Sequence, residues 1–101
     1  MPEEKYDSAH LRHAIRFIIA QHLDPRNYRI FLFGSAVAGT PLRASDIDIG
    51  ILGDESVPGR IMERIREELD RLRTLRRLDL VDFRSVDESF RNAALKHVEQ
   101  L

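Results

Sequence analysis

The chain has 101 residues, 43% of them hydrophobic and 33% charged, a composition that predicts one folded domain over residues 1–101 and excludes a disordered chain. Sixteen Lys and Arg nearly balance seventeen Asp and Glu, so the net charge of −1 excludes a general electrostatic attraction to DNA or RNA. The absence of cysteine excludes disulfides and thiol catalysis, and the polar start and short apolar runs predict a cytoplasmic protein without a membrane span.

The first predicted element is a helix that begins near residue 8. Its apolar residues recur at the three- and four-residue spacing of one helical face: Leu11, Ala14, Ile15, Ile18, Ile19 and Leu23. Asp7 or Ser8 can cap its start. Asp24-Pro25 should end it, because the residue before a proline is disfavoured in the helical conformation.

Two strands are predicted next. Residues 28–33, YRIFLF, form a β-branched and aromatic run that indicates a buried strand, and residues 46–52, DIDIGIL, alternate almost perfectly between polar and apolar. Gly34-Ser35 follows the first strand directly, and Gly39, Pro41 and Ser45 indicate a loop between the two strands.

The second half of the chain predicts a helix, a strand and a last helix. Residues 58–75 carry an apolar stripe at helical spacing. The arginines of this segment, together with Arg76 and Arg77, are interleaved with acidic residues and indicate a solvated, ion-paired face, with a contact to a partner or to RNA as the alternative. Residues 78–83, LDLVDF, form the third strand. Ser85 and Glu88 have the spacing of a capping box for a last helix, whose buried side would be Val86, Phe90, Ala94, Val98 and Leu101. The order predicts an α/β fold: a small mixed sheet of about three strands with flanking helices.

The alternating strand separates core residues from candidate functional residues. Ile47, Ile49 and Ile51 should face the core, so Asp46 and Asp48 share the opposite face. Two neighbouring carboxylates repel each other, and a bound Mg²⁺, which prefers oxygen ligands and recruits phosphates, removes that conflict. For Asp-x-Asp alone, a solvated strand face is the alternative, because the short pattern is common by chance.

The Gly34-Ser35 turn adds a second candidate site residue pair. A strand that turns sharply at Gly-Ser exposes backbone N–H groups and a hydroxyl, which together can hold a phosphate. Ten residues separate this pair from Asp46, so the fold would bring a phosphate cradle and a pair of metal ligands to neighbouring strand ends.

The stretch GS-AVAGTPLRAS-DID resembles the signature of the nucleotidyltransferases of the DNA polymerase β superfamily, and is similar in detail to its minimal nucleotidyltransferases. The resemblance implies a polymerase β palm-like fold. It further implies that Gly34, Ser35 and Ser45 bind the nucleotide and that Asp46 and Asp48 bind two Mg²⁺ ions. Many relatives also carry an arginine in the turn, where this chain has Ala36 and Ala38; Arg43 is an alternative cation in the same loop.

The family also has a third carboxylate on the strand after the long helix. Asp79 and Asp82 are both candidates, but three residues separate them on a strand, so they should point to opposite faces. We expect Asp79 to be the third catalytic carboxylate and metal ligand, because Leu-Asp-Leu-Val matches the family form better. Asp82 would then be a charge at the strand end or facing a loop.

The implied reaction transfers a nucleoside monophosphate, AMP from ATP in the expected case, to a hydroxyl. The implied acceptor lies on a separate small helical partner of the HEPN or substrate-binding type, with this chain as the antitoxin of a HEPN/MNT toxin–antitoxin pair. One alternative is a non-catalytic module that binds and regulates such a partner. Another is nucleotidyl transfer to an RNA 3′ end or a small-molecule hydroxyl, although the near-neutral charge argues against long RNA.

Overall fold

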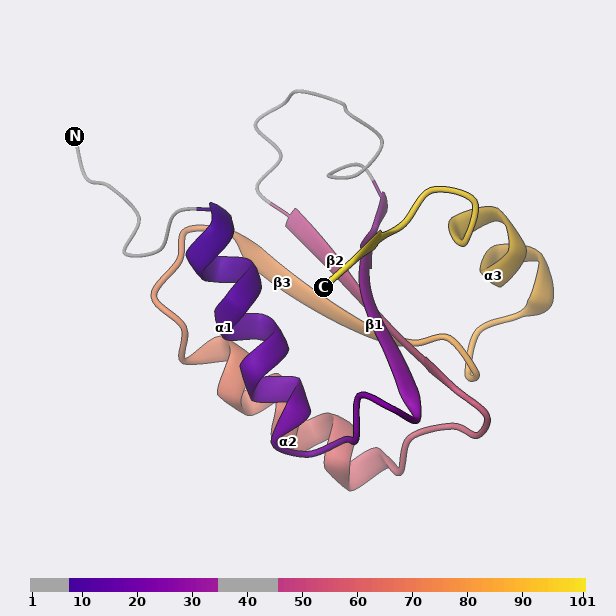
Figure 1. Cartoon of the computed structure of the whole chain (residues 1–101), viewed down its shortest axis with the longest axis horizontal. Coiled ribbons are helices and arrows are strands. Elements are labelled where there is room, and N and C mark those ends of the chain that lie inside the picture. Colours follow the sequence, from indigo (N-terminus) through magenta and orange to yellow (C-terminus); the bar gives the residue numbers. More distant parts are fainter. Residues whose placement is uncertain (1–7, 35–45) are drawn as a thin grey trace.

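The computed structural model describes residues 8–34 and 46–101, and this part contains three helices and four strands. In chain order they are α1 (Ser8–Ala20), β1 (Tyr28–Phe33), β2 (Asp46–Gly53), α2 (Gly59–Asp70), β3 (Arg77–Asp82), α3 (Glu88–Ala94) and β4 (Glu99–Gln100). The four strands form one sheet in the order β3-β2-β1-β4 (Figure 1).

The sheet is mixed, as the sequence predicts. β1 runs antiparallel to β2 and β4, whereas β2 and β3 are parallel because α2 carries the chain back between them. The α/β class and the first three strands are therefore confirmed.

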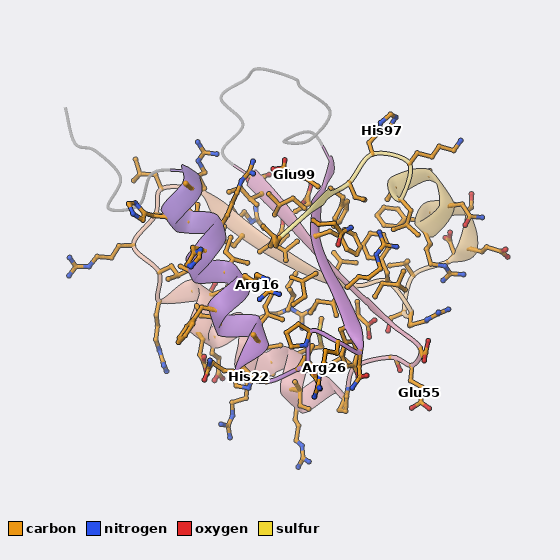
Figure 2. All side chains as sticks on the ribbon, in the orientation of Figure 1. Arg16, His22, Arg26, Glu55, His97 and Glu99 are labelled. Carbon is orange, nitrogen blue, oxygen red and sulfur yellow. The ribbon has the colours of Figure 1, made fainter. Side chains whose placement is uncertain are left out.

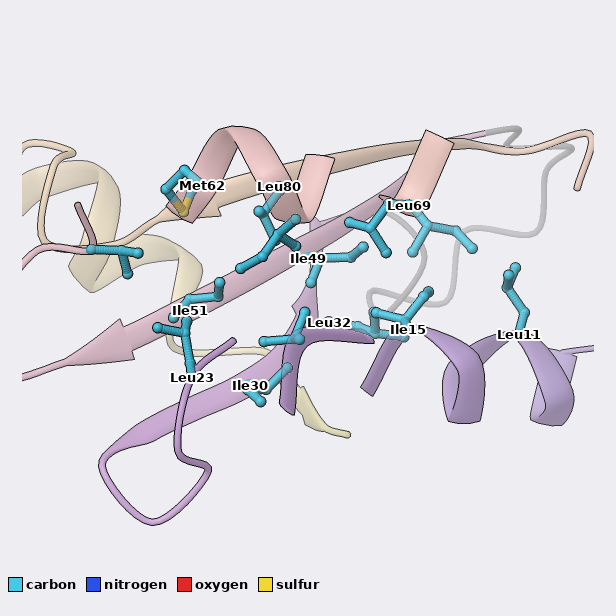
Figure 3. Close-up of a cluster of buried hydrophobic side chains, with 14 residues drawn as sticks. Leu11, Ile15, Leu23, Ile30, Leu32, Ile49, Ile51, Met62, Leu69 and Leu80 are labelled. Atoms are coloured by element: carbon cyan, nitrogen blue, oxygen red, sulfur yellow. The ribbon is translucent and has the colours of Figure 1, made fainter. Parts of the chain in front are cut away.

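An aliphatic cluster covers one face of the sheet. Alternate residues of β2, Ile47, Ile49 and Ile51, are buried there against the apolar sides of α1 and α2. Figure 3 shows Leu11 and Ile15 of α1 and Leu69 of α2 in one cluster with Ile49 and Ile51 of β2. The predicted inward direction of the three isoleucines is confirmed.

The other face of the sheet carries aromatic side chains under α3. Phe31, Phe33 and Phe83 form a second buried cluster, with the rings of Phe31 and Phe83 edge-on at 5.0 Å between centroids. Gly50 of β2 makes room for them, since a Cβ there would lie 2.6 Å from Phe31 Cζ and 2.8 Å from Phe83 Cε1. Figure 1 shows α3 set apart from α1 and α2, on the far side of β1.

The predicted helix over residues 58–75 is too long. α2 ends at Asp70, and the backbone N–H groups of Arg71 and Leu72 donate to Glu68 O and Leu69 O in a tightened final turn. The chain has to turn there because β3 already begins at Arg77. Leu75, expected in the buried stripe, is 75% exposed.

The predicted last helix is wrong at both ends. Asp87, and not Ser85, caps α3 by accepting a hydrogen bond from the Phe90 backbone N–H at 2.8 Å, and none of the helix's own residues is fully buried. The chain then forms the unpredicted fourth strand, β4, which pairs with Phe31 and Leu32 of β1. Beyond it the Leu101 N–H donates to Ile30 O at 2.9 Å, so the chain end supplies hydrogen-bond partners for the free edge of β1.

Among the helices of residues 8–34 and 46–101, each is too short or too polar to cross a membrane.

Candidate active site

Three carboxylates lie on the α3 side of the sheet, at one end of two adjacent strands. Asp46 and Asp48 come from β2, and Asp79 of β3 is the register partner of Asp48. Partners in a parallel pair point to the same face, so the side chains of Asp48 and Asp79 are neighbours. The structure thus places the three predicted catalytic carboxylates on one face and at one end of the sheet, opposite the buried isoleucines.

Gly34 closes the site from the β1 side. It follows Phe33, the register partner of Asp48, and its φ of +81° is in the left-handed region that glycine adopts most easily. A Cβ on Gly34 would overlap Asp48 Oδ2 and lie 3.2 Å from Asp48 Cγ. The position therefore requires glycine twice, for its backbone angle and for its contact with a carboxylate.

The other predicted nucleotide ligands lie outside the described residues. These are Ser35 and Ser45. Ala36 and Ala38, which replace the expected turn arginine, and Arg43, the alternative cation, also lie outside the described residues.

The electrostatics of Asp48 reflect this arrangement. Burial raises the pKa of Asp48 above its ordinary value of 3.8, and the charges of Asp79 and Asp46 raise it further. Each cause opposes ionisation, and a cation held between the carboxylates would relieve all three.

The donor chemistry fits Mg²⁺, because carboxylate oxygens are its preferred protein ligands and the site keeps room for phosphate oxygens and water. As they stand, however, the residues that the structure describes contain no group of three His, Cys, Asp or Glu side chains close enough to hold a metal ion. The three carboxylates are therefore near one another, but their oxygens do not yet surround one metal position.

Asp82 lies at the end of β3, as expected, and it is on the α2 side of that strand, away from the other three carboxylates. It is also buried, with only 7% of the residue exposed. Its carboxylate accepts hydrogen bonds from the Val57 N–H at 2.8 Å, the Arg84 N–H at 3.0 Å and the Ser85 hydroxyl at 3.3 Å. These bonds join the start of α2 to the end of β3, so Asp82 stabilises the fold and does not face the other three carboxylates.

Arg77 is a site residue that the sequence analysis missed. It was grouped with the solvated arginines of the long helix, but it opens β3, where it is the register partner of Asp46. Its Nε lies 3.8 Å from Asp79 Oδ1. The signal that could have found it is its position two residues before Asp79, which places both side chains on one face of a strand.

Two clefts share Phe33, Asp48 and Phe90. The acidic cleft, of about 540 Å³, follows the β3 edge of the sheet and is lined by residues that include Asp48, Asp79, Asp70, Arg66, Val81 and Phe90. The apolar cleft, of about 420 Å³, lies between the end of β1 and α3, and its walls are Phe33, Phe90, Ala93 and Ala94. Gly34, Asp48 and His97 complete it. The carboxylates thus border a more polar cleft on the β3 side and a more apolar cleft on the α3 side.

Comparison with known proteins shows to which family this chain belongs. The family profile described as "Polymerase beta, Nucleotidyltransferase" matches residues 14–101. The chain belongs to this nucleotidyltransferase family. That assignment confirms the resemblance read from the sequence and the nucleotidyltransferase fold, and the family is typically metal-dependent.

Individual relatives agree. The probable protein adenylyltransferase MntA of Haemophilus influenzae is 32% identical over 83 residues, covering 82% of this chain and 72% of the relative. A crystal structure of a toxin–antitoxin with AMP-PNP is 26% identical at a TM-score of 0.58, covering 86% of this chain and 69% of that one. The MNT antitoxin in complex with tri-AMPylated HEPN toxin from Shewanella oneidensis has a TM-score of 0.59 at 23% identity, covering 89% of this chain and 67% of that one.

Proposed function

We propose that this chain is a Mg²⁺-dependent protein adenylyltransferase that transfers AMP from ATP to a hydroxyl of a HEPN toxin partner and thereby acts as its antitoxin. The observation that carries the proposal is the register pairing of Asp48 with Asp79 beside the Gly34 turn, in a chain 32% identical to a probable protein adenylyltransferase. Similarity to a toxin–antitoxin with AMP-PNP supports ATP as the donor. Similarity to the antitoxin bound to a tri-AMPylated HEPN toxin supports the fold and suggests the partner.

In the proposed reaction, an acceptor oxygen forms a bond to the α-phosphorus of ATP while the bond from that phosphorus to the pyrophosphate oxygen breaks. The acceptor hydroxyl loses its proton, and pyrophosphate leaves. Asp46, Asp48 and Asp79 would hold two Mg²⁺ ions, which when bound neutralise the charge of the attacking and leaving oxygens.

The chain's own residues would have distinct tasks. Asp79, with 47% of its side chain exposed beside the acidic cleft, is placed to orient the acceptor hydroxyl and accept its proton. Gly34, with Ser35 and Ser45, would hold the triphosphate through backbone N–H groups and hydroxyls. Asp48 would keep donor and acceptor in one geometry, since it lines both clefts.

The open acidic cleft is the proposed entry for the acceptor side chain. It lies at the edge of the sheet, because no strand pairs with the outer side of β3 in the described part of the chain. A side chain on the surface of a partner can reach such an edge without the partner entering the domain. The cytoplasm, where ATP is present, is the proposed location.

Labelled ATP distinguishes this proposal from its alternatives. The purified chain should be incubated with Mg²⁺, the proposed HEPN partner, and ATP labelled at either the α- or the γ-phosphate. Label from α-labelled ATP alone should appear on the partner, and Asp48→Asn should abolish it without preventing complex formation. Label from γ-labelled ATP would indicate phosphoryl transfer and contradict the proposal. Inhibition of the partner with no label from either would favour a non-catalytic binding module.

A further inference from the structure

The two edges of the sheet are covered differently. At the β4 edge, Arg16 Nε of α1 donates to Leu101 O at 3.1 Å, and Glu99 pairs with another arginine of the same helix (Figure 2). At the β3 edge, one side chain of α2 reaches the strand backbone: Arg66 donates to Leu80 O at 3.1 Å. A strand edge with open backbone groups is able to pair with another chain.

The backbone of β3 presents Leu78 and Leu80 to the outside. The Phe83 N–H donates to Ile51 O of β2, and backbone groups alternate in direction along a strand, so the odd-numbered residues of β3 pair with β2. The contact between Arg66 and Leu80 O agrees with this direction. In the described part of the chain, the Leu78 N–H, the Leu78 carbonyl and the Leu80 N–H have no hydrogen-bond partner.

The acidic cleft follows this open edge. Residues 78–81 of β3 line it, together with Arg66 and Asp70 of α2. A smaller hollow of about 270 Å³ shares Asp70 and Asp79 with this cleft and continues it to Arg77. At about 3.3 Å per residue, this length of edge accommodates an extended segment of about five residues.

We propose that the acceptor side chain of the partner is carried on an extended segment that pairs with the free edge of β3 as an added strand. The proposal rests on the proposed function and deepens it, since it states how the acceptor is presented. Residues opposite each other on neighbouring strands point to the same face, with their Cβ atoms about 5 Å apart. The residue opposite Asp79 would therefore place its hydroxyl group on the face of the three carboxylates.

The same pairing assigns the neighbours of the acceptor to the other face. Side chains alternate along a strand, so the residues before and after the acceptor would point toward α2, where Arg66 and Asp70 line the cleft. An acidic residue beside Arg66 and a basic residue beside Asp70 would complement these charges. Arg66, which covers Leu80 O in the chain alone, would give up that carbonyl to an N–H of the added strand.

Amide hydrogen exchange tests the pairing directly. It should be measured residue by residue for the full chain alone and with the proposed HEPN partner, Mg²⁺ and α,β-methylene ATP, an ATP analogue that does not transfer AMP. The Leu78 and Leu80 N–H groups should exchange at least about tenfold more slowly in the complex, because each gains a hydrogen bond. The Gln100 N–H is the matched control. The Leu101 N–H donates to β1, so the Gln100 N–H points outward at the β4 edge, and its exchange should not change.

Proline at position 78 gives a second test. Leu78→Pro removes an N–H that β2 does not use and fills its place with the proline ring, whereas Leu78→Ala removes the leucine side chain and keeps the N–H. The kcat/KM of AMP transfer should be about tenfold lower for Leu78→Pro than for Leu78→Ala, with equal affinities for Mg²⁺-ATP. Equal transfer by the two variants would overturn the proposal. If Leu78→Pro does not fold, exchange in the unmodified chain decides.

The outcomes separate the strand pairing from the proposed function. If the partner binds and gains AMP, but Leu78 and Leu80 exchange as fast as in the chain alone, the pairing is wrong and the proposed function stands. If both N–H groups are protected and the partner gains no AMP from ATP, the proposed function fails and the pairing stands as the contact of a binding module. Protection of Gln100 instead would place the contact at the β4 edge and overturn the proposal. If no complex forms, both fail.

Discussion

The two faces of the sheet differ in cover and in content, although the same strand supplies residues to both. On one face, Ile47, Ile49 and Ile51 of β2 are closed in by α1 and α2. On the other face, Asp46 of the same strand is exposed and Asp48 is half-buried in a cleft with Phe90 of α3, so both carboxylates stay accessible. One face of the sheet thus mainly stabilises the fold, and the other carries the proposed catalytic residues. Substitutions on the first face should therefore lower the free energy of unfolding, and substitutions on the second should lower activity.

The largest effect is expected from Asp48→Asn, on the open face. Loss of a carboxylate that would hold the metal ions removes several kcal/mol of transition-state stabilisation, so adenylyl transfer to the partner should fall about a thousandfold. The thermal unfolding temperature should not fall. If Asp48→Asn lost activity only because it unfolds, the proposal that this face is catalytic and not stabilising would be wrong.

Asp82→Asn affects stability from the covered face. Asn cannot accept all the hydrogen bonds that the buried carboxylate receives from Val57, Arg84 and Ser85, and one unsatisfied buried donor costs about 1–3 kcal/mol. Denaturant unfolding should show a loss of that size, with activity per folded molecule retained. Asp87→Asn is the matched control, because Asn caps helices as well as Asp does. A catalytic defect without destabilisation would instead place Asp82 in the reaction.

The pH dependence of stability sharpens the comparison. In the folded chain the pKa of Asp48 is raised above 3.8 by burial and by Asp79 and Asp46, so the fold favours its protonated form. That contribution is fully present below pH 3.8 and is lost as the pH rises through the folded-state pKa. Asp48→Asn should therefore unfold at a higher temperature than the unmodified chain at pH 7 in metal-free buffer, and the gain should disappear at low pH. A gain that is equal at every pH would exclude this cause.

The smallest effect is expected at Arg77. Its guanidinium lies 3.8 Å from Asp79 Oδ1 and competes with a cation for that carboxylate, but an exposed ion pair contributes only about 0.2–1 kcal/mol. Arg77→Ala should lower the Mg²⁺ concentration for half-maximal transfer by about two- to fivefold, and Arg73→Ala should not change it. A higher Mg²⁺ requirement would indicate that Arg77 binds the triphosphate instead.

The sequence was sufficient for features that a local pattern encodes. The Ile and Asp alternation of residues 46–51 predicted the core face and the carboxylate face of β2, and the three-residue separation of Asp79 and Asp82 predicted that only one of them could join Asp48. The family and fold followed from the Gly34-Ser35 turn and its spacing to Asp46.

Features that depend on distant partners were not predictable in this way. The hydrogen bond between the Asp82 carboxylate and the Val57 N–H joins residues 25 positions apart, and the sequence around either residue carries no pattern that predicts it. β4 is two residues long, too short for a periodic signal, and it forms because β1 has a free edge. Arg77 was predicted to belong to the solvated face of the long helix, because it continues the run of arginines in that segment. Its place in β3 depends instead on α2 ending at Asp70.

The most direct test is the intact mass of the HEPN partner after incubation with ATP, Mg²⁺ and this chain. The account predicts that the partner gains one or more adenylyl groups with the unmodified chain and none with Asp48→Asn, although both chains still bind it. A partner whose mass is unchanged by the unmodified chain, or that gains as much with Asp48→Asn, would contradict the account.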